Sequence, residues 1–183
     1  SRYAKQAKVI HLEIDPAEVD KNVKADVAVL GDAKEALLAL SQCVENREHK
    51  EWLQEFRKLE FEEYSEVIKE ELNPSQGELT MGEVIRSVND HTEGKAIVVT
   101  DVGQHQMVSC RYAKFKQSRS LITSGGLGTM GFCLPAAIGA KFAKPNREVV
   151  AVIGDGGFQM TIQELGTIFQ TKIPVKIVVL NNE

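Results

Sequence analysis

The sequence predicts an α/β protein built on a doubly wound, mostly parallel sheet. Two short runs of apolar, largely β-branched residues, at 148–153 and 175–180, have the composition of buried parallel strands. Between them, residues 161–171 carry apolar side chains at helical spacing. A strand, a helix and a strand within about 30 residues have the usual size of a right-handed crossover. Strands and helices alternate in this way through the second half of the chain, which is typical of this fold class.

Residues 1–44 are expected to form the end of a Rossmann-like middle domain. Two short runs, at 8–14 and 26–30, have strand character. Asp32 is followed three positions later by Glu35, the spacing of a capping box, so a helix is expected next. Two strands and one helix cannot close a hydrophobic core, so we expect the earlier strands of this domain to be missing from the chain.

Residues 45–77 are expected to form a helical linker. The segment is charged and carries an interrupted apolar stripe at helical spacing, made of Trp52, Phe56, Leu59, Val67 and Leu72. Asparagine, proline and glycine at 73–77 then break the helical pattern. The alternating charges favour a solvated helix that joins two domains.

Residues 78–183 are expected to form the doubly wound domain. Thr80 and Glu83 have capping-box spacing and open an amphipathic helix. The elements expected after it are a strand at 96–100, a turn and helix at 102–112, an extended segment at 121–123 and a helix rich in small residues at 131–143. The strand-helix-strand unit at the C-terminal end completes the series.

Composition excludes several classes of function. Of 183 residues, 43% are hydrophobic and 26% charged, as in ordinary globular proteins. The net charge of −4 and the absence of a basic stripe argue against nucleic acid or an anionic membrane as partner. No apolar run approaches the roughly 18 residues of a membrane helix. Cys43, Cys110 and Cys133 are odd in number and widely spaced, which favours reduced thiols in a cytoplasmic protein.

Polar side chains follow the two C-terminal strands at the point where each strand ends. Asp155 comes directly after one strand and Asn182 after the other, so both are expected at the ligand-binding edge of the sheet. Their oxygens suit Mg²⁺, which usually completes its octahedron with substrate phosphates and water. Gly156 and Gly157 allow the backbone to approach a ligand. The pattern predicts a metal-bridged diphosphate site; the alternative is a glycine-rich turn with a capping aspartate, and an ordinary Asn-Asn loop.

A second glycine motif has the spacing of the dinucleotide fingerprint, at Gly126, Gly128 and Gly131. The strand before it is weak, and Glu148 begins the next strand where the fingerprint needs an acid at that strand's end. A glycine turn that brings backbone against a different cofactor therefore explains these residues better than a nicotinamide site.

Three segments together resemble a known family. They are Gly-Asp-Gly with Asn-Asn about 25 residues later, TDVGQHQM at 100–107 and SGGLGTMGF at 124–132. Together they resemble the catalytic (large) subunit of acetolactate synthase, a thiamine-diphosphate-dependent enzyme of the biosynthetic, FAD-containing type. The resemblance covers essentially the whole chain. The family's catalytic subunit is considerably longer, which implies that this chain is a C-terminal-region fragment.

The resemblance assigns a role to each motif. It implies that Asp155 and Asn182 bind Mg²⁺, and that the thiamine diphosphate contacts are Val102, Gly103, Gln104, His105, Gly128, Met130, Asp155, Gly156, Gly157 and Asn182. Met130 under the thiazolium ring would enforce the bent cofactor conformer. From the residues alone, His105 could equally cap a helix start, and Met130 could be a core methionine.

The resemblance also implies FAD contacts in the first part of the chain, at Glu13, Ile14, Asp32 and Ala33. Carboxylates at strand ends can hold ribose hydroxyls or adenine. The alternatives are a plain strand-end acid for Glu13 and a helix N-cap for Asp32.

By resemblance, the activity is the decarboxylating condensation of pyruvate with a second 2-oxo acid in branched-chain amino-acid biosynthesis. A homodimer, with a small regulatory subunit as a further partner, is expected. The family's catalytic glutamate belongs to an N-terminal domain absent here, so no catalytic residue is assigned and the fragment alone is expected to be inactive. The alternatives are an enzyme of the pyruvate oxidase or glyoxylate carboligase type and a non-catalytic cofactor-binding module.

The chain departs from the family at two positions of interest. Val108 replaces the usual aromatic residue after HQM, a change expected to bear on substrate access. Gly157 stands where the family often has serine or alanine, which we expect to be a mild change.

Overall fold

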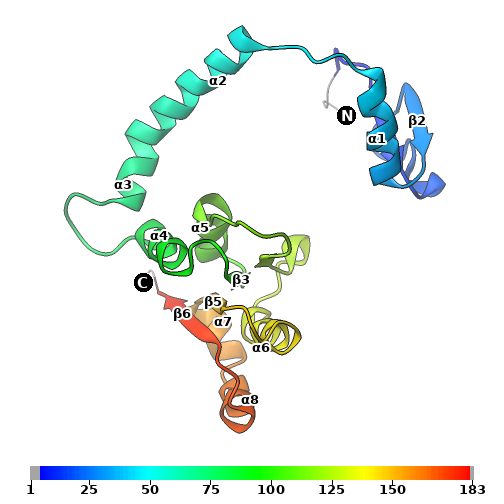
Figure 1. Ribbon diagram of the computed structural model, residues 1–183. Coiled ribbons are helices and arrows are strands. Elements are labelled where there is room, and N and C mark those ends of the chain that lie inside the picture. Colours follow the sequence, from blue (N-terminus) through cyan, green and yellow to red (C-terminus); the bar gives the residue numbers. More distant parts are fainter. Residues whose placement is uncertain (1–4, 182–183) are drawn as a thin grey trace. The chain divides into compact units, whose positions relative to one another are not determined.

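The computed structural model describes residues 5–181 and divides into two compact units (Figure 1). The first unit ends at Glu55 and the second begins at Phe56. None of the helices described is both long enough and apolar enough to cross a bilayer. The three cysteines form no disulfide: Cys43 and Cys110 are exposed and Cys133 is buried.

The first unit contains a small parallel sheet and one longer helix. Strand β1 (Ile10–Glu13) pairs in parallel with β2 (Val27–Leu30), and α1 (Ala33–Cys43) follows. A short 3-10 helix, η1 (Pro16–Glu18), lies between the strands. Asp32 caps α1, since its carboxylate accepts a hydrogen bond from the Lys34 backbone N–H at 2.9 Å. None of the described residues of this unit is buried.

A long helical segment follows and runs into the second unit. It consists of α2 (Lys50–Glu63), a π-helical turn η2 (Tyr64–Ile68) and α3 (Lys69–Leu72). From Phe56 on, the segment belongs to the second unit, where Glu63 pairs with Arg111 at 2.6 Å. The predicted limits of the linker, residues 45–77, stay a prediction; the compact second unit begins within α2.

The second unit is built on a four-stranded, fully parallel sheet. Its strands are β3 (Ile97–Thr100), β4 (Leu121–Ile122), β5 (Val149–Gly154) and β6 (Lys176–Leu180), in the spatial order β4-β3-β5-β6. Each neighbouring pair is parallel. This confirms the predicted α/β class and the parallel sheet.

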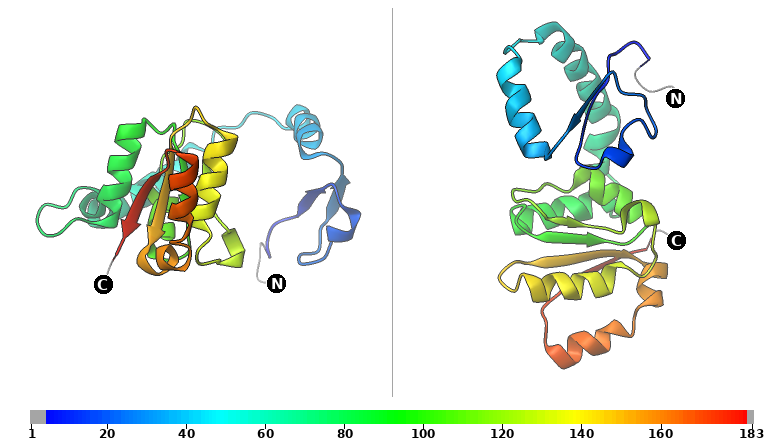
Figure 2. Two further views of the ribbon diagram at one scale, coloured as in Figure 1. Left: turned by 90° about the horizontal axis from the view of Figure 1, so that it is seen from below. Right: turned by 90° about the vertical axis from the view of Figure 1, so that its right-hand side faces the viewer.

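Helices cover both faces of this sheet (Figure 2, right). On one face lie α4 (Met81–Thr92) and α5 (Gln104–Tyr112); on the other lie α6 (Cys133–Ala143), α7 (Asp155–Met160) and α8 (Glu164–Thr171). Thr80 caps α4 by accepting from the Glu83 backbone N–H at 3.1 Å, as its sequence spacing predicts. The sheet is therefore doubly wound.

The core divides between the two faces because side chains alternate along a strand. Toward α6 point Ile97, Val99, Val149, Ala151 and Ile153, all at most 2% exposed. Toward α4 and α5 point Val98, Val150 and Val152, which meet Ile85 and Tyr112. Val108 of α5 packs on this second cluster. Position 108 thus takes part in the packing of α5, and the expected effect of Val108 on substrate access stays a prediction.

The helix expected at 161–171 differs from prediction in one respect. A separate helix, α7, begins at Asp155 itself, and α8 begins only at Glu164. Helix formation through Gly156 and Gly157 runs against the low helix propensity of glycine. Tertiary contacts described below hold this turn, so sequence periodicity could not reveal it.

Candidate functional site

The carboxyl ends of β3 and β5 meet at the topological switch point of the sheet. The chain leaves β3 through α5 toward β4 on one side, and leaves β5 through α7 and α8 toward β6 on the other. Open α/β sheets bind ligands in the crevice formed at such a point. The loops that begin with Asp101 and Asp155 border this crevice, since Thr100 pairs with Val152 in register.

Asp155 lies at the rim of the crevice. It is exposed, it is the first residue of α7, and its carboxylate makes no hydrogen bond or ion pair within residues 5–181. Gly154 pairs with Leu180, so Asp155 and the segment after β6 leave the sheet at the same edge. Asn182 lies outside the described residues, and its role as a metal ligand stays a prediction. At no point in the described chain do three histidine, cysteine or acidic side chains gather as metal ligands.

His105 lies under the end of β5 and is only 6% exposed. A Cβ placed on Gly154 would lie 2.9 Å from its Cε1 atom, so the imidazole packs directly against that glycine. The ring atom Nε2 is buried and has no hydrogen-bond partner within residues 5–181. Burial lowers the pKa of His105, against the opposing charges of Asp101 and Asp155, so the imidazole is neutral near pH 7. The N-cap of α5 is Gly103, so the helix-capping alternative for His105 is wrong.

Met130 approaches the same crevice from the glycine-rich loop. A Cβ on Gly156 would lie 3.2 Å from the Met130 methyl carbon, so this methyl group reaches the first turn of α7. The side chain is 49% exposed, which rules out the alternative of a core methionine. In the same loop Gly128 adopts a left-handed conformation (φ 57°) and faces Val102.

The structure thus brings together most of the residues expected to contact thiamine diphosphate. The β3 loop supplies His105 and Val102, the glycine-rich loop supplies Gly128 and Met130, and the β5 turn lies against both. Gln104 is the exposed first residue of α5, next to His105.

Asp101 is a residue of this site to which sequence analysis assigned no role. Its side chain is 0% exposed, and its carboxylate accepts hydrogen bonds from the backbone N–H groups of Gly131 at 3.0 Å and Phe132 at 3.1 Å. A Cβ on Gly157 would lie 1.7 Å from its Oδ2 atom. Any side chain at position 157 must displace this carboxylate, so the expectation of a mild change there is wrong for this chain.

The four residues expected to contact FAD lie in the first unit. The register pairs Glu13 with Leu30, so the loops after β1 and β2 leave the small sheet side by side. Both carboxylates bind local backbone: Glu13 accepts from the Ile14 N–H at 2.9 Å, and Asp32 caps α1. These contacts agree with the alternatives of a strand-end acid and an N-cap. The FAD contacts of Glu13, Ile14, Asp32 and Ala33 stay predictions.

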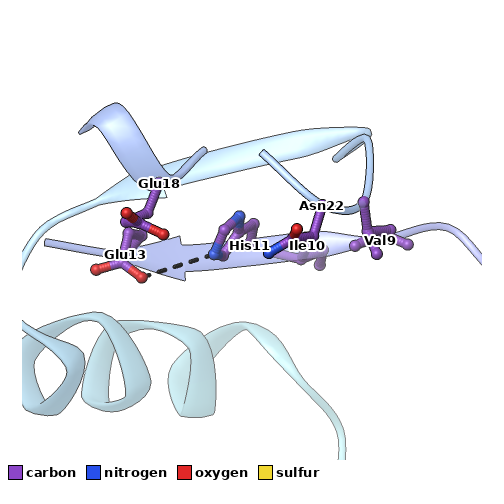
Figure 3. Close-up of a pocket in the computed structure, with 7 residues that line it drawn as sticks. Val9, Ile10, His11, Glu13, Glu18 and Asn22 are labelled. Atoms are coloured by element: carbon purple, nitrogen blue, oxygen red, sulfur yellow. Dashed lines mark ion pairs between the residues drawn. The ribbon is translucent and has the colours of Figure 1, made fainter. Parts of the chain in front are cut away.

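A pocket of about 360 Å³ lies beside β1 in this unit (Figure 3). His11 and Glu13 line it from the strand, with His11 Nε2 3.7 Å from the Glu13 carboxylate. The other lining residues are Val9, Ile10, Glu18, Asn22 and Val23. Of the four residues expected to contact FAD, Glu13 is a lining residue.

Two family comparisons agree with this geometry. Residues 101–183 match the family described as thiamine pyrophosphate enzyme, C-terminal TPP binding domain. Residues 1–40 match the thiamine pyrophosphate enzyme, central domain. The chain belongs to the family of thiamine-diphosphate-dependent enzymes.

Within this family the chain is similar along its whole length to acetolactate synthases. It is 44% identical over 183 residues to the acetolactate synthase large subunit of Lactococcus lactis, covering 100% of this chain and 31% of that protein. It is 42% identical over 192 residues to the chloroplastic acetolactate synthase of Arabidopsis thaliana, covering 99% and 27%. It is 40% identical over 195 residues to the acetolactate synthase isozyme 3 large subunit of Escherichia coli, covering 100% of this chain and 32% of that protein. The chain thus spans about a third of the length of these relatives.

Proposed function

We propose that this chain forms the metal- and diphosphate-binding half of the cofactor site of an acetolactate synthase. In that activity pyruvate condenses with a second 2-oxo acid and loses CO₂, as a step of branched-chain amino-acid biosynthesis. The observation that carries the proposal is the convergence of the three motif loops on the crevice between β3 and β5. The acetolactate synthases among its relatives favour this activity over that of other thiamine-diphosphate enzymes.

The residues around the crevice fit a magnesium diphosphate. The free carboxylate of Asp155 is a hard oxygen donor of the kind Mg²⁺ takes, and Asn182 would supply an amide oxygen. A cation held by so few side chains needs phosphate and water oxygens to complete its shell. The buried Nε2 atom of His105 lacks a partner among the described residues and offers a hydrogen bond to a ligand.

Met130 and Gly156 fit the ring portion of the cofactor. The half-exposed thioether presents a polarizable surface to the crevice and rests on the glycine backbone behind it. Thiamine diphosphate, when bound, supplies the carbanion chemistry that joins 2-oxo acids, and the protein supplies binding and orientation. Met130 would support the bent conformation of the cofactor.

The proposal extends to the rest of the enzyme. The proton-transferring glutamate of the family has no counterpart among the motifs of this chain, so we assign it to another part of the protein, contributed across a homodimer. FAD would bind near Glu13 and Asp32, and a small regulatory subunit is a further partner. The exposed thiols of Cys43 and Cys110 fit the reducing conditions of the cytoplasm.

Calorimetry on the full-length protein tests the cofactor site. We expect thiamine diphosphate to bind only with Mg²⁺, and Asp155→Ala to abolish this metal-dependent binding. Glu148→Ala is the matched control, because Glu148 is exposed just before β5, at the opposite end of that strand. No metal-dependent binding by the wild-type protein would instead indicate a non-catalytic module.

Product analysis with pyruvate tests the reaction. Acetolactate is the expected product. With phosphate and oxygen present, acetyl phosphate would place the protein with the pyruvate oxidases. In a parallel assay with glyoxylate, a semialdehyde would place it with the glyoxylate carboligases.

A further inference from the structure

We propose that Asp101 is a positioning residue that sets the place of Met130 in the cofactor site. It does so by holding the turn at Gly131 and Phe132, which directly follows Met130 in the chain. This inference rests on the proposed thiamine diphosphate site and adds to it a residue that need not touch the cofactor.

The first observation is the bonding of the Asp101 carboxylate. Its Oδ2 atom accepts from the Gly131 N–H at 3.0 Å and its Oδ1 atom from the Phe132 N–H at 3.1 Å. Hydrogen bonds to an ionised acceptor are roughly twice as strong as neutral ones, and full burial removes competition from water. Two consecutive backbone amides are therefore fixed to the end of β3, some 30 residues earlier in the chain.

The second observation is that the turn is held from its other side as well. Gly131 has a left-handed conformation, with φ 81°. A Cβ there would lie 3.0 Å from Thr161 Cγ2 and 3.3 Å from Met160 Cβ. The turn is enclosed between the Asp101 carboxylate and the end of α7, so it has little room to shift. Because Met130 directly precedes this turn, the fixed turn also restricts where Met130 can lie.

The third observation is that Asp101 joins all three loops of the crevice. It begins the loop that leads into α5 and His105, it accepts hydrogen bonds from the turn after Met130, and its Oδ2 atom lies against Gly157 in the first turn of α7. Burial lowers the pKa of His105 and raises the pKa of Cys133, and the Asp101 charge acts upward on both groups, which agrees with its central place. Burying a carboxylate has a desolvation cost in free energy. Here the buried carboxylate specifies one arrangement of the three loops.

The test compares Asp101→Asn with the wild-type full-length protein. Asparagine keeps the shape but turns one acceptor into an NH₂ group that faces a backbone N–H. We expect faster hydrogen exchange at 131–132 in the cofactor-free protein. We also expect binding of thiamine diphosphate with Mg²⁺ to weaken by about 10 to 100-fold, the usual cost of losing a partner that orients a ligand-contacting group.

Thr100→Val is the matched control. Thr100 is the neighbouring residue, is equally buried at 0% exposure, and has a hydroxyl with no hydrogen-bond partner in the part of the chain that the structure describes. Removing an unpaired buried hydroxyl is expected to leave both exchange at the turn and cofactor affinity unchanged. If Asp101→Asn does not fold, Gly157→Ala serves in its place for the exchange measurement at 131–132, since a methyl group there displaces the carboxylate and keeps its charge; unchanged exchange in that variant would overturn the positioning role.

The outcomes separate the inference from the function on which it rests. A wild-type protein that fails to bind thiamine diphosphate overturns the proposed function and the positioning role with it. A wild type that binds, together with an Asp101→Asn protein whose affinity lies within twofold, overturns the positioning role alone. The positioning role is likewise overturned if Asp101→Asn lowers the melting temperature without changing exchange at the turn.

Discussion

Asp101 and Asp155 occupy comparable places in the sequence and opposite places in the structure. Each directly follows a buried parallel strand, β3 or β5, at the same edge of one sheet. Asp101 is 0% exposed and bound by two backbone amides, whereas Asp155 is exposed with no hydrogen bond or ion pair in the described chain. The Asp101 carboxylate therefore holds the turn at Gly131 and Phe132, and the Asp155 carboxylate is available to a ligand.

The difference follows from where each strand ends. Thr100 is in register with Val152, so β3 stops two residues before Gly154, the last residue of β5. Asp101 thus lies below the rim, covered by the glycine-rich turn and by α7, and Asp155 lies one residue beyond the rim. A two-residue offset between neighbouring strands is enough to separate a structural carboxylate from a ligand-binding one.

The largest expected effect is a difference in stability between the two alanine variants. Asp101→Ala leaves two buried N–H groups unpaired, at about 1–3 kcal/mol each, so we expect a loss of roughly 2–6 kcal/mol in the free energy of unfolding. Asp155→Ala removes an exposed side chain and is expected to change the free energy of unfolding by less than about 0.5 kcal/mol. Denaturant unfolding of the full-length protein measures both. Equal losses would show that the comparison is wrong.

The sequence predicted the sheet well because its strands carry a strong local signal. The apolar runs that became β5 and β6 were placed to within one residue at each end, and the cap at Thr80 was found from its spacing. These features depend on residues close together in the chain. The same holds for the general position of the site, since strand ends in a parallel sheet share an edge.

The sequence could not separate Asp101 from Asp155, because the offset between β3 and β5 is set by tertiary pairing. The early start of α7 has a similar cause. Its first turn contains two glycines, and the turn is held in place by the Asp101 carboxylate and the Met130 methyl group, which come from distant segments. Local helix propensity gave no indication of it.

A second prediction sharpens the role of Gly157. In Gly157→Ala the new methyl group would lie 1.7 Å from Asp101 Oδ2 and 2.8 Å from its Cγ, but 3.5 Å from its Cβ. We expect this overpacking to cost about 1–3 kcal/mol of unfolding free energy. In the Asp101→Ala background the two close atoms are gone, so Gly157→Ala should cost little. A double-mutant cycle measures this coupling, and additive losses would contradict the contact.

A third prediction uses Cys133 as a reporter. Its thiol is 0% exposed and contacts the Val99 carbonyl at 3.0 Å, and burial raises its pKa far above the ordinary value. Native labelling with a thiol reagent should modify Cys43 and Cys110 rapidly and Cys133 slowly. Because Cys133 follows the turn that Asp101 holds, Asp101→Asn should accelerate its labelling several-fold.

Asp155→Asn is the control for the labelling experiment. Its side chain does not bond the turn, so the rate at Cys133 should equal that of the wild type. Peptide mapping by mass spectrometry assigns the modified thiol. Unchanged labelling of Cys133 in Asp101→Asn would show that the turn does not depend on the carboxylate.

The smallest expected effect concerns His105 and pH. Burial lowers its pKa in the folded protein below the ordinary 6.5, while Asp101 and, to a lesser degree, Asp155 oppose the shift. Below pH 6.5 the unfolded chain therefore binds a proton at His105 more readily than the folded protein does. The free energy of unfolding decreases as the pH is lowered. His105→Gln should remove this part of the fall in melting temperature between pH 7 and 5. Asp101→Asn should steepen the fall more than Asp155→Asn, because Asp101 has the larger opposing electrostatic interaction with the imidazole. The reverse order would show that Asp155 has the stronger interaction.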